Sequence, residues 1–527
     1  MAARSGVGRA ALLVAALTAV STVLGLVRDA VVAAVYGAGA ELDAWFVALG
    51  LSSILLGVLG TSLTRAVTPV VAREAEAEKV AGATGAAGPP DGADAAGRCT
   101  GHPGWWTASV VGTVALGVVG VVLGLAAAPI SVVLAPGLAG SDDGTLVLLV
   151  RVVLLATVLI AATDLLAGLA HGHGVFRWVA LQGIPFNLVM IAAAALLGPR
   201  YGISALAWGF VVGSLLRMLL QLWPAHRHRW RLATRLDLAG PGWREITAMV
   251  PALMVGQAVV NVNTLVDRAV ASTVQEGAVS AIFLGWRLTS LPETLIVAAL
   301  MAPLYPAMGA AAGRPRELRA LLHRGTGVTL TILVPVVAAL AVVPDRVVAL
   351  AFGRGSFDED AVALTATAVV WFLPALLAVG WRHVVVSASY AVGDTRGPVA
   401  ISIVAMVVNV VGDLVLAPVL GVPGIVLATS VSLVLAAVLT SWYVADRHSL
   451  LDVARARGQV VRALVSGLAA GLVAAGTALA LGSAPDLLVV PVVGLAALAG
   501  QQAVLHLLRA PERRVVAEVV GLLRRRA

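Results

Sequence analysis

Apolar stretches of membrane-spanning length follow one another along most of this chain, and short polar links separate them. A helix needs about 20 apolar residues to cross the hydrocarbon core of a bilayer, whereas a membrane β-strand needs about 10. The stretches are of helix length and predict fourteen transmembrane helices. They cover about residues 10–36, 42–70, 106–135, 145–169, 175–197, 202–223, 247–272, 277–308, 325–350, 361–390, 397–417, 421–444, 460–482 and 486–508. The fold class is therefore predicted to be an all-α polytopic membrane protein.

The links between these helices alternate in charge. Arginines gather in every second link, as at Arg177, Arg227 and Arg396, whereas the other links carry acidic residues such as Glu41 and Asp358. Because positively charged links remain on the cytoplasmic side, both termini are predicted to be cytoplasmic. Two termini on one side require an even number of spans, which agrees with fourteen. The basic N-terminal run is interpreted as a retained first helix rather than a cleaved signal.

Three links differ from the others in composition. The polar segment 74–104 is rich in Ala, Gly and Pro, and it is predicted to be a flexible cytoplasmic loop. The segments 225–246 and 310–324 mix arginine with apolar residues, which is typical of short amphipathic helices on a membrane surface.

Composition narrows the function classes. The 527 residues are 60% hydrophobic and 12% charged, and the net charge of +8 comes from the arginine-rich links, so no nucleic-acid partner is indicated. The lone Cys99 excludes an internal disulfide and a cysteine-based metal cluster. The chain has no phosphate-binding Gly-rich loop and no grouping typical of a nucleophilic enzyme, and it is predicted not to be an enzyme.

An internal repeat divides the chain. Arg28-Asp29-Ala-Val corresponds to Asp267-Arg268-Ala-Val, and Arg177 precedes Tyr201 by the same spacing as Arg396 precedes Leu420. Helices 1–6 and 7–12 are therefore predicted to form two lobes related by a pseudo-two-fold axis, and such transporters bind between their halves. The predicted parts are an N-terminal lobe (1–224), a cytoplasmic amphipathic linker (225–246), a C-terminal lobe (247–444), two extra helices (445–510) and a basic cytoplasmic tail (511–527).

The two charged pairs of the repeat lie within apolar stretches. A charge at the bilayer centre costs about 2.5–3.5 kcal/mol, so these side chains are expected to face a polar cavity. An arginine-lined cavity suits an anionic head group, because guanidinium offers forked donors to phosphate oxygens. The alternative is that the charges pair internally and hold helices together. The candidates for the cavity are Arg28, Asp29, Asp43, Arg65, Arg268 and Arg287. Further charges within the spans are Arg151, Asp164, Arg217, Glu293 and Arg382, and packing or snorkelling is favoured for Arg151 and Arg382.

A second group of polar residues suggests a cation site. Asn409 and Asp413 stand four residues apart, which places both side chains on one helical face, and Thr429 lies on the next helix. Together with Asp267 they offer only oxygen ligands, as a hard monovalent cation requires. The alternative is a hydrogen-bonded cluster between helices.

Several motifs resemble those of the MurJ/MviN family of lipid II flippases in the MOP superfamily. They are Ser21–Asp29 (STVLGLVRD), Tyr36–Gly39 (YGAG), Asp43–Ala48 (DAWFVA), Tyr201–Gly209 (YGISALAWG), Phe352–Asp358 (FGRGSFD) and Tyr390–Arg396 (YAVGDTR). The resemblance runs from about residue 8 to residue 510. It implies a multi-pass protein of the bacterial cytoplasmic membrane that acts in peptidoglycan synthesis, cell-wall biogenesis and cell shape.

The resemblance also implies roles for particular residues. A cavity between the lobes would accept the undecaprenyl-diphosphate saccharide head group at Arg28, Asp29, Asp43 and Arg287, and would open alternately to each face of the membrane. A sodium site would be formed by Asp267, Asn409, Asp413, Thr429 and the carbonyl of Ile425, with Na⁺ as coupling ion and no other cofactor. The last two helices would form a groove for the lipid tail. Membrane lipid and cell-wall synthesis proteins are the implied partners.

The chain departs from the family pattern at two places. Thr22 stands where the family usually has a second arginine, and Ser52–Gly57, with Leu56, replaces an arginine-rich run after helix 2 begins. Arg65 would compensate in part if it faces the cavity. Two alternatives to lipid II transport follow: an exporter of another polyprenyl-linked saccharide, drug or natural product on the same scaffold, and a non-transporting cell-wall scaffold.

Overall fold

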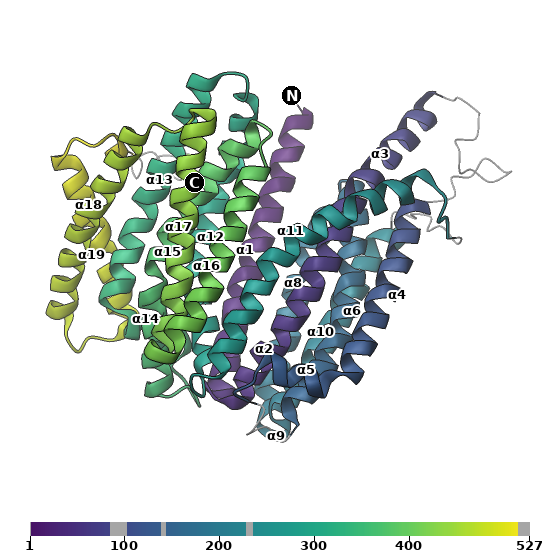
Figure 1. The fold of residues 1–527 in the computed structure, drawn as a ribbon, viewed down its shortest axis with the longest axis horizontal. Helices are drawn as coiled ribbons and strands as arrows, with labels where there is room; N and C mark the ends of the chain where they lie inside the picture. The colour runs from purple at the N-terminus through teal and green to yellow at the C-terminus, as the bar shows by residue number, and fades with distance from the viewer. Residues whose placement is uncertain (1, 85–102, 139–143, 228–235, 515–527) are drawn as a thin grey trace. The chain divides into compact units, whose positions relative to one another are not determined.

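The helices predicted from the apolar pattern are present in the computed structural model, which describes residues 2–84, 103–138, 144–227 and 236–514 (Figure 1). Each of the fourteen predicted stretches is helical over most of its length, and all elements of the described part are helices. Most of the loop 74–104, the middle of the linker 225–246 and most of the tail 511–527 lie outside the described residues. The chain forms two compact units, residues 1–273 and 274–527.

Unit 1 runs from α1 to α11. Its elements are α1 (Ala2–Tyr36), α2 (Ala40–Leu55), the π-helix η1 (Leu56–Thr61), α3 (Ser62–Thr84), α4 (Pro103–Leu125), α5 (Ala127–Leu134), α6 (Thr145–Gly172), α7 (Arg177–Leu181), α8 (Gly183–Ala192), the π-helix η2 (Ala193–Leu197), α9 (Gly198–Tyr201), α10 (Ile203–Arg227) and α11 (Pro241–Ser272). The predicted helix at 42–70 is thus interrupted by η1, which begins at Leu56. Such π turns are frequent at functional sites.

Unit 2 contains the remaining long helices. Its elements are α12 (Ala278–Ala310), α13 (Pro315–Val342), α14 (Pro344–Phe352), α15 (Glu359–Ala391), α16 (Arg396–Leu420), α17 (Val422–His448), α18 (Val453–Leu481), α19 (Asp486–Leu507) and the 3₁₀ turn η3 (Pro511–Arg514). The predicted surface helix at 310–324 is wrong as a separate element, because α13 runs unbroken from Pro315 into the membrane-spanning stretch. Pro315 at the start of α13 fits a helix beginning there.

Twelve helices of the described part are long and apolar enough to span a membrane. Helix α12 adds a thirteenth if its parts Ala278–Leu295 and Leu300–Ala310, bent by 53°, form one span. Pro303 accounts for this bend, because its ring clashes with the carbonyl four residues earlier, at Ala299. The remaining predicted span, at 247–272, corresponds to α11, which is a 32-residue helix but is not among the spans recognised by length and composition. The multi-pass fold is confirmed, and fourteen is an approximate count.

The internal repeat is visible in matching turns. Gly174 and Gly393 stand at the repeat spacing that separates Arg177 from Arg396, and both have positive φ, 73° and 80°. The next residue in each turn, Val175 or Asp394, donates its backbone N–H to the carbonyl five residues earlier, at 2.8 and 3.1 Å. Only glycine adopts this backbone conformation without strain, so both units keep it at the same place.

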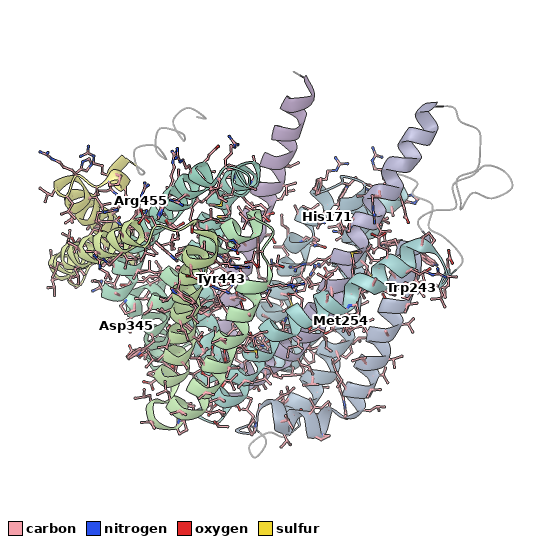
Figure 2. All side chains as sticks on the ribbon, turned by 45° about the horizontal axis from the view of Figure 1, so that its top comes forward. His171, Trp243, Met254, Asp345, Tyr443 and Arg455 are labelled. Carbon is pink, nitrogen blue, oxygen red and sulfur yellow. The ribbon has the colours of Figure 1, made fainter. Side chains whose placement is uncertain are left out.

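Helix α11 packs along unit 1, although the repeat places it first in the second lobe. It contacts α2, η1, α3 and α4. Its N-terminal part joins the apolar cluster of Trp105, and Trp243 on its first turn is labelled in Figure 2. Glycines of α2 and η1 receive its polar side chains: a Cβ on Gly50 would meet Arg268, and one on Gly57 would meet Asn261. Sequence similarity and packing thus divide the chain differently, and the lobe boundaries drawn from the repeat remain predictions.

The two last long helices pack on one another and on α13. Figure 1 shows α18 and α19 side by side at the yellow end of the chain. Their shared core contains small residues, among them Ala470, Ala474 and Ala497, together with Val489 and Val493. Small residues let membrane helices approach closely, which gives van der Waals packing where the hydrophobic effect between helices is absent. The pair is thereby fixed to the rest of unit 2 through α13.

Candidate functional site

Arg28 is held inside unit 1 by partners on two helices. Its Nε and Nη2 donate to Oδ1 of the neighbouring Asp29 at 3.0 and 2.7 Å, and Nη1 donates to Oδ1 of Asn187 on α8 at 3.2 Å. The Arg28 side chain is 22% exposed and that of Asp29 is 5% exposed. A guanidinium fixed in this way presents a positive charge at a defined position, with the carboxylate balancing it.

Asn187 is a residue that sequence reasoning missed. Its Nδ2 donates to the carbonyls of Ser21 and Gly183 at 3.2 and 2.8 Å, so the amide is fixed while its oxygen accepts from Arg28. The sequence does carry a signal, because Asn187 is a buried polar residue in an otherwise apolar helix, Gly183–Ala192. Polar residues in such helices commonly bond across helices. Asn187 therefore positions Arg28 between α1 and α8.

The other candidates in unit 1 lie in different surroundings. Asp43 is buried near the start of α2, where it makes polar interactions and where a carboxylate is favoured by the helix dipole. Arg65 is exposed on α3, just beyond η1. The hydroxyl of Thr22, at the place of the second family arginine, donates to the carbonyl of Thr18 at 2.9 Å within α1. Thr22 therefore adds no charge next to Arg28.

Arg268 has a structural contact in this arrangement. Its Nη1 donates to the carbonyl of Phe46 on α2 at 2.5 Å, and the side chain lies over Gly50. On the same helix, Asn263 donates to Asp267 at 3.5 Å. The contact with Phe46 supports the interpretation that Arg268 holds helices together, and its role toward a substrate remains a prediction.

Other charges within the spans also bond to protein groups. Arg217 on α10 pairs with Asp164 on α6 at 2.9 Å. Arg151 donates to the carbonyl of Gly124 at 3.0 Å. Arg382 on α15 donates to the hydroxyl of Ser402 at 2.6 Å and to that of Thr440 at 3.3 Å, which ties α15 to α16 and α17. These contacts agree with the packing role expected for Arg151 and Arg382.

Arg287 lies on α12 of unit 2, where it is half-buried and makes polar interactions. The other substrate candidates, Arg28, Asp29, Asp43, Arg65 and Arg268, all belong to unit 1. A joint site of Arg28 and Arg287 therefore remains a prediction.

Part of the candidate cation site is brought together between α16 and α17, where Asn409 contacts Asp413 on its own helix and Ser432 on the next. Asn409 and Asp413 are both buried, and Nδ2 of Asn409 donates to Oδ2 of Asp413 at 2.9 Å. Thr429 donates to the carbonyl of Ile425 at 3.1 Å. The hydroxyl of Ser432, which sequence reasoning missed, lies 3.3 Å from Oδ1 of Asn409 and 2.8 Å from the carbonyl of Thr429. Asp267 belongs to α11 of unit 1.

The donor set between α16 and α17 fits a hard cation. It contains a carboxylate, an amide oxygen, two hydroxyls and a backbone carbonyl, which are the oxygen ligands that such cations take. The carboxylate of Asp413 supplies the one formal negative charge, so the set suits a monovalent ion such as Na⁺. Without an ion, the same groups form a hydrogen-bonded cluster, which is the alternative expected from the sequence.

An apolar groove lies between helices of the same unit. It has a volume of about 670 Å³ and is lined from α13, α14 and α19 by residues that include Pro335, Leu340, Val347, Pro491 and Leu495. Such a surface has no chemistry for a polar ligand, and it suits a hydrocarbon chain. The sequence predicted that the last two helices form a lipid-tail groove; α19 lines this one together with α13.

Two repeated helical units with charged side chains buried in their membrane-spanning helices define a polytopic membrane transporter. The chain belongs to the lipid II flippase MurJ family, whose family model matches residues 98–488. It is 29% identical over 438 residues to "Lipid II flippase MurJ" of Burkholderia cenocepacia, a match that covers 80% of this chain and 81% of the relative. The function class is therefore lipid II flippase, and the exporter and scaffold alternatives are not favoured.

Solved structures support the fold. A structure described as "Lipid II flippase MurJ, inward closed conformation" is similar with a TM-score of 0.74 and 18% identity, covering 94% of this chain and 99% of that chain. An inward-facing multidrug resistance MATE family transporter of the MOP superfamily is similar with a TM-score of 0.66 and 16% identity, covering 82% and 95%. At these identities the similarity shows the shared fold alone.

Proposed function

We propose that this member of the lipid II flippase family moves lipid II from the inner to the outer face of the bacterial cytoplasmic membrane by alternating access. Arg28 carries the proposal, because it is an intramembrane arginine fixed by Asp29 and Asn187. A charge this costly in a membrane is expected to serve binding, and guanidinium matches the diphosphate of lipid II. Arg287 on α12 is proposed to bind the same head group from the other unit.

Asp29 and Asp43 balance the arginines when no substrate is bound. Asp29 already takes two of the Arg28 donors, and its carboxylate is almost enclosed. An incoming diphosphate competes with this carboxylate for the guanidinium, so binding exchanges one charged partner for another instead of leaving a charge unpaired. Arg65 beyond η1 is proposed to meet the head group as it enters from the cytoplasmic side.

The apolar groove on unit 2 is proposed to hold part of the lipid tail while the head group crosses. Its lining from α13 and α19 is apolar, and α18 and α19 are fixed to α13 by close packing. The polyprenyl chain then stays in a lipid-like environment, and the protein has to shield only the polar head group.

Sodium is proposed to reset the cycle through the cluster of Asn409, Asp413, Ile425 and Thr429, with Asp267 joining from α11. Asp413 would hold the ion together with oxygens of Asn409, Ile425 and Thr429, and its carboxylate, which now accepts a hydrogen bond from Asn409, would balance the charge of the ion. The transport step is proposed to be non-covalent, with both termini in the cytoplasm, as the arginine-rich links predict.

Conditional depletion with complementation tests the proposal. Wild type is expected to restore lipid II to the outer face, whereas Arg28→Ala is expected to fail with normal protein level. Arg151→Ala is the matched control, since this arginine lies in a span and its hydrogen bond within the described residues goes to the backbone carbonyl of Gly124; it is expected to complement. Thr22→Arg reports whether the second family charge increases transport. Full complementation by both Arg28→Ala and Arg287→Ala would refute the assigned roles.

A further inference from the structure

A pair of protonatable side chains joins α12 to α15 within unit 2, and no transport step described so far uses it. Nδ1 of His383 lies 2.7 Å from Oε1 of Glu293. The Glu293 side chain is 12% exposed, whereas that of His383 is 56% exposed. The carboxylate is therefore almost enclosed, while more than half of the imidazole is exposed.

The internal repeat shows what this pair replaces. His383 precedes Arg396 by the same spacing as Asp164 precedes Arg177, so the two residues are equivalent. In unit 1, Asp164 pairs with Arg217, which is always charged. Unit 2 has Ala436 at the position equivalent to Arg217 and places the partner of His383 on α12 instead. An ion pair that is permanent in unit 1 thus becomes a pair of two protonatable groups in unit 2.

The charged groups around the pair are few. Arg287 lies on α12, six residues before Glu293. Arg382 is next to His383, but it is directed to Ser402 and Thr440 on α16 and α17. The neighbouring α13 has no charged residue after Arg324, and α17 has none before Asp446. On α14, Asp345 and Arg346 lie in the first turn, and Arg346 bonds to the link before α19.

The pair lies next to the bend of α12. Before it, Gly285 lets α12 approach Ala368 of α15 closely, and Trp286 packs on Phe372 with ring centroids 5.1 Å apart. After it, Val297 is buried with Leu376. The 53° bend begins at Leu295, two residues beyond Glu293. A change in the link between Glu293 and His383 therefore acts where α12 changes direction.

The contact between Nδ1 of His383 and Glu293 determines where the pair takes up a proton. With Nδ1–H donated to Glu293, Nε2 of His383 is the nitrogen that takes up a further proton. The pair then changes from a net charge of −1 to zero, and the hydrogen bond from a neutral imidazole to the carboxylate becomes an ion pair. Histidine is the side chain that ordinarily makes this change between about pH 5 and 8.

We propose that Glu293 and His383 form a proton-binding site whose occupancy sets the link between α12 and α15 and couples proton movement to lipid II transport. This inference rests on the proposed flippase function. Proton binding strengthens the contact between Glu293 and His383 and removes a net charge from the span. The protonated and deprotonated states therefore favour different bends of α12.

Transport is measured first, with the full chain in sodium-free proteoliposomes held at zero membrane potential, using fluorescent lipid II. For one proton per cycle, the ratio of outer to inner lipid II is expected to change up to about tenfold for each pH unit across the membrane. His383→Gln is expected to lose this response. His506→Gln on α19 removes another histidine as the matched control, and it is expected to keep the response. The exchange Glu293→His with His383→Glu is expected to restore it.

A second measurement does not depend on transport. The titration of His383 is followed by NMR of histidine-labelled protein, and Glu293→Gln is expected to move its midpoint to lower pH without moving that of His506. An unchanged His383 midpoint would overturn the proton site. Lipid II that crosses with no dependence on the pH gradient in wild type overturns the coupling but leaves the flippase function intact. Failure of lipid II to cross under any ion gradient or potential contradicts the flippase function itself, and the NMR titration then still decides whether the pair binds a proton.

Discussion

Four carboxylates within the membrane-spanning helices have different kinds of partner in unit 1 and in unit 2. In unit 1, the carboxylates of Asp29 and Asp164 are paired with arginines. In unit 2, Asp413 is bonded to an amide, and Glu293 to a histidine. The internal repeat relates parts of the two units, and Gly174 in unit 1 and Gly393 in unit 2 form the same turn.

The difference suggests a division of roles. Arginine stays charged at every physiological pH, so unit 1 offers a permanent positive charge suited to a diphosphate. A carboxylate with neutral or protonatable partners exchanges small cations more readily, because its charge is not already neutralised by a fixed one. We therefore infer that unit 1 binds substrate and unit 2 binds the coupling ions. Each prediction below tests one side of this comparison.

The largest effect is expected at the cation cluster. Asp413→Asn removes its formal charge, and the sodium concentration needed for half-maximal transport is expected to rise at least about tenfold, as for changes around other metal sites. Transport of fluorescent lipid II in proteoliposomes over a sodium series measures it. Asp29→Asn in unit 1 is the matched control and is expected to leave the sodium dependence unchanged. Equal shifts from both variants would contradict the division between the units.

The substrate side is sharpened by Asn187. Asn187→Ala removes the amide oxygen that accepts from Arg28, and one hydrogen bond is worth about 1 kcal/mol, which corresponds to about fivefold weaker lipid II binding. Asn187→Asp adds a second carboxylate beside Arg28 and is expected to weaken binding further. Binding of lipid II to purified protein, with thermal unfolding measured in parallel, separates the two causes. Equal losses of stability and no loss of affinity would show that Asn187 only supports the fold.

The sequence predicted the helices well because the bilayer itself imposes their length. The i,i+4 spacing of Asn409 and Asp413 likewise predicted their contact, since both lie on one helix. The packing of α11 was not predictable in this way. It depends on Gly50 and Gly57, which leave room for side chains from a helix more than 200 positions away. Nothing local in the sequence marks these two glycines among the 55 of the chain.

The contact between Glu293 and His383 was likewise not predictable from the sequence. Glu293 stood out as an intramembrane charge, but His383 did not, because it follows Arg382 near the cytoplasmic end of a predicted helix. Their partnership joins two helices separated by α13 and α14. The repeat spacing, which places His383 at the position of Asp164, suggests a role for their contact beyond packing.

A smaller effect is expected from the permanent pair of unit 1. Asp164→Asn leaves Arg217 without its carboxylate, and bonds between membrane helices average about 0.6 kcal/mol, with a maximum near 1.7. The free energy of unfolding is expected to fall by about 0.6–1.7 kcal/mol, with no change in the pH dependence of transport. A double-mutant cycle with Arg217→Gln measures the coupling. A changed pH response in Asp164→Asn would mean that unit 1 also takes part in proton coupling.

The smallest effect is expected at the repeated turn that contains Val175 in unit 1 and Asp394 in unit 2. In unit 2, hydrogen bonds from Tyr443 at 2.7 Å and from His448 at 2.8 Å hold the pKa of Asp394 at about 2, below its ordinary value of 3.8. A lowered pKa in the folded state means that the carboxylate stabilises the fold above about pH 4, and that this stabilisation is lost as the pH falls toward 2. Asp394→Asn is therefore expected to lower the unfolding temperature slightly at pH 7, and the curves of variant and wild type should converge near pH 2. Val175→Ala in the equivalent turn of unit 1 is expected to give a difference that does not vary with pH. If the difference in unfolding temperature between Asp394→Asn and wild type were constant across this pH range, the contacts of Tyr443 and His448 with Asp394 would act through packing and not through charge.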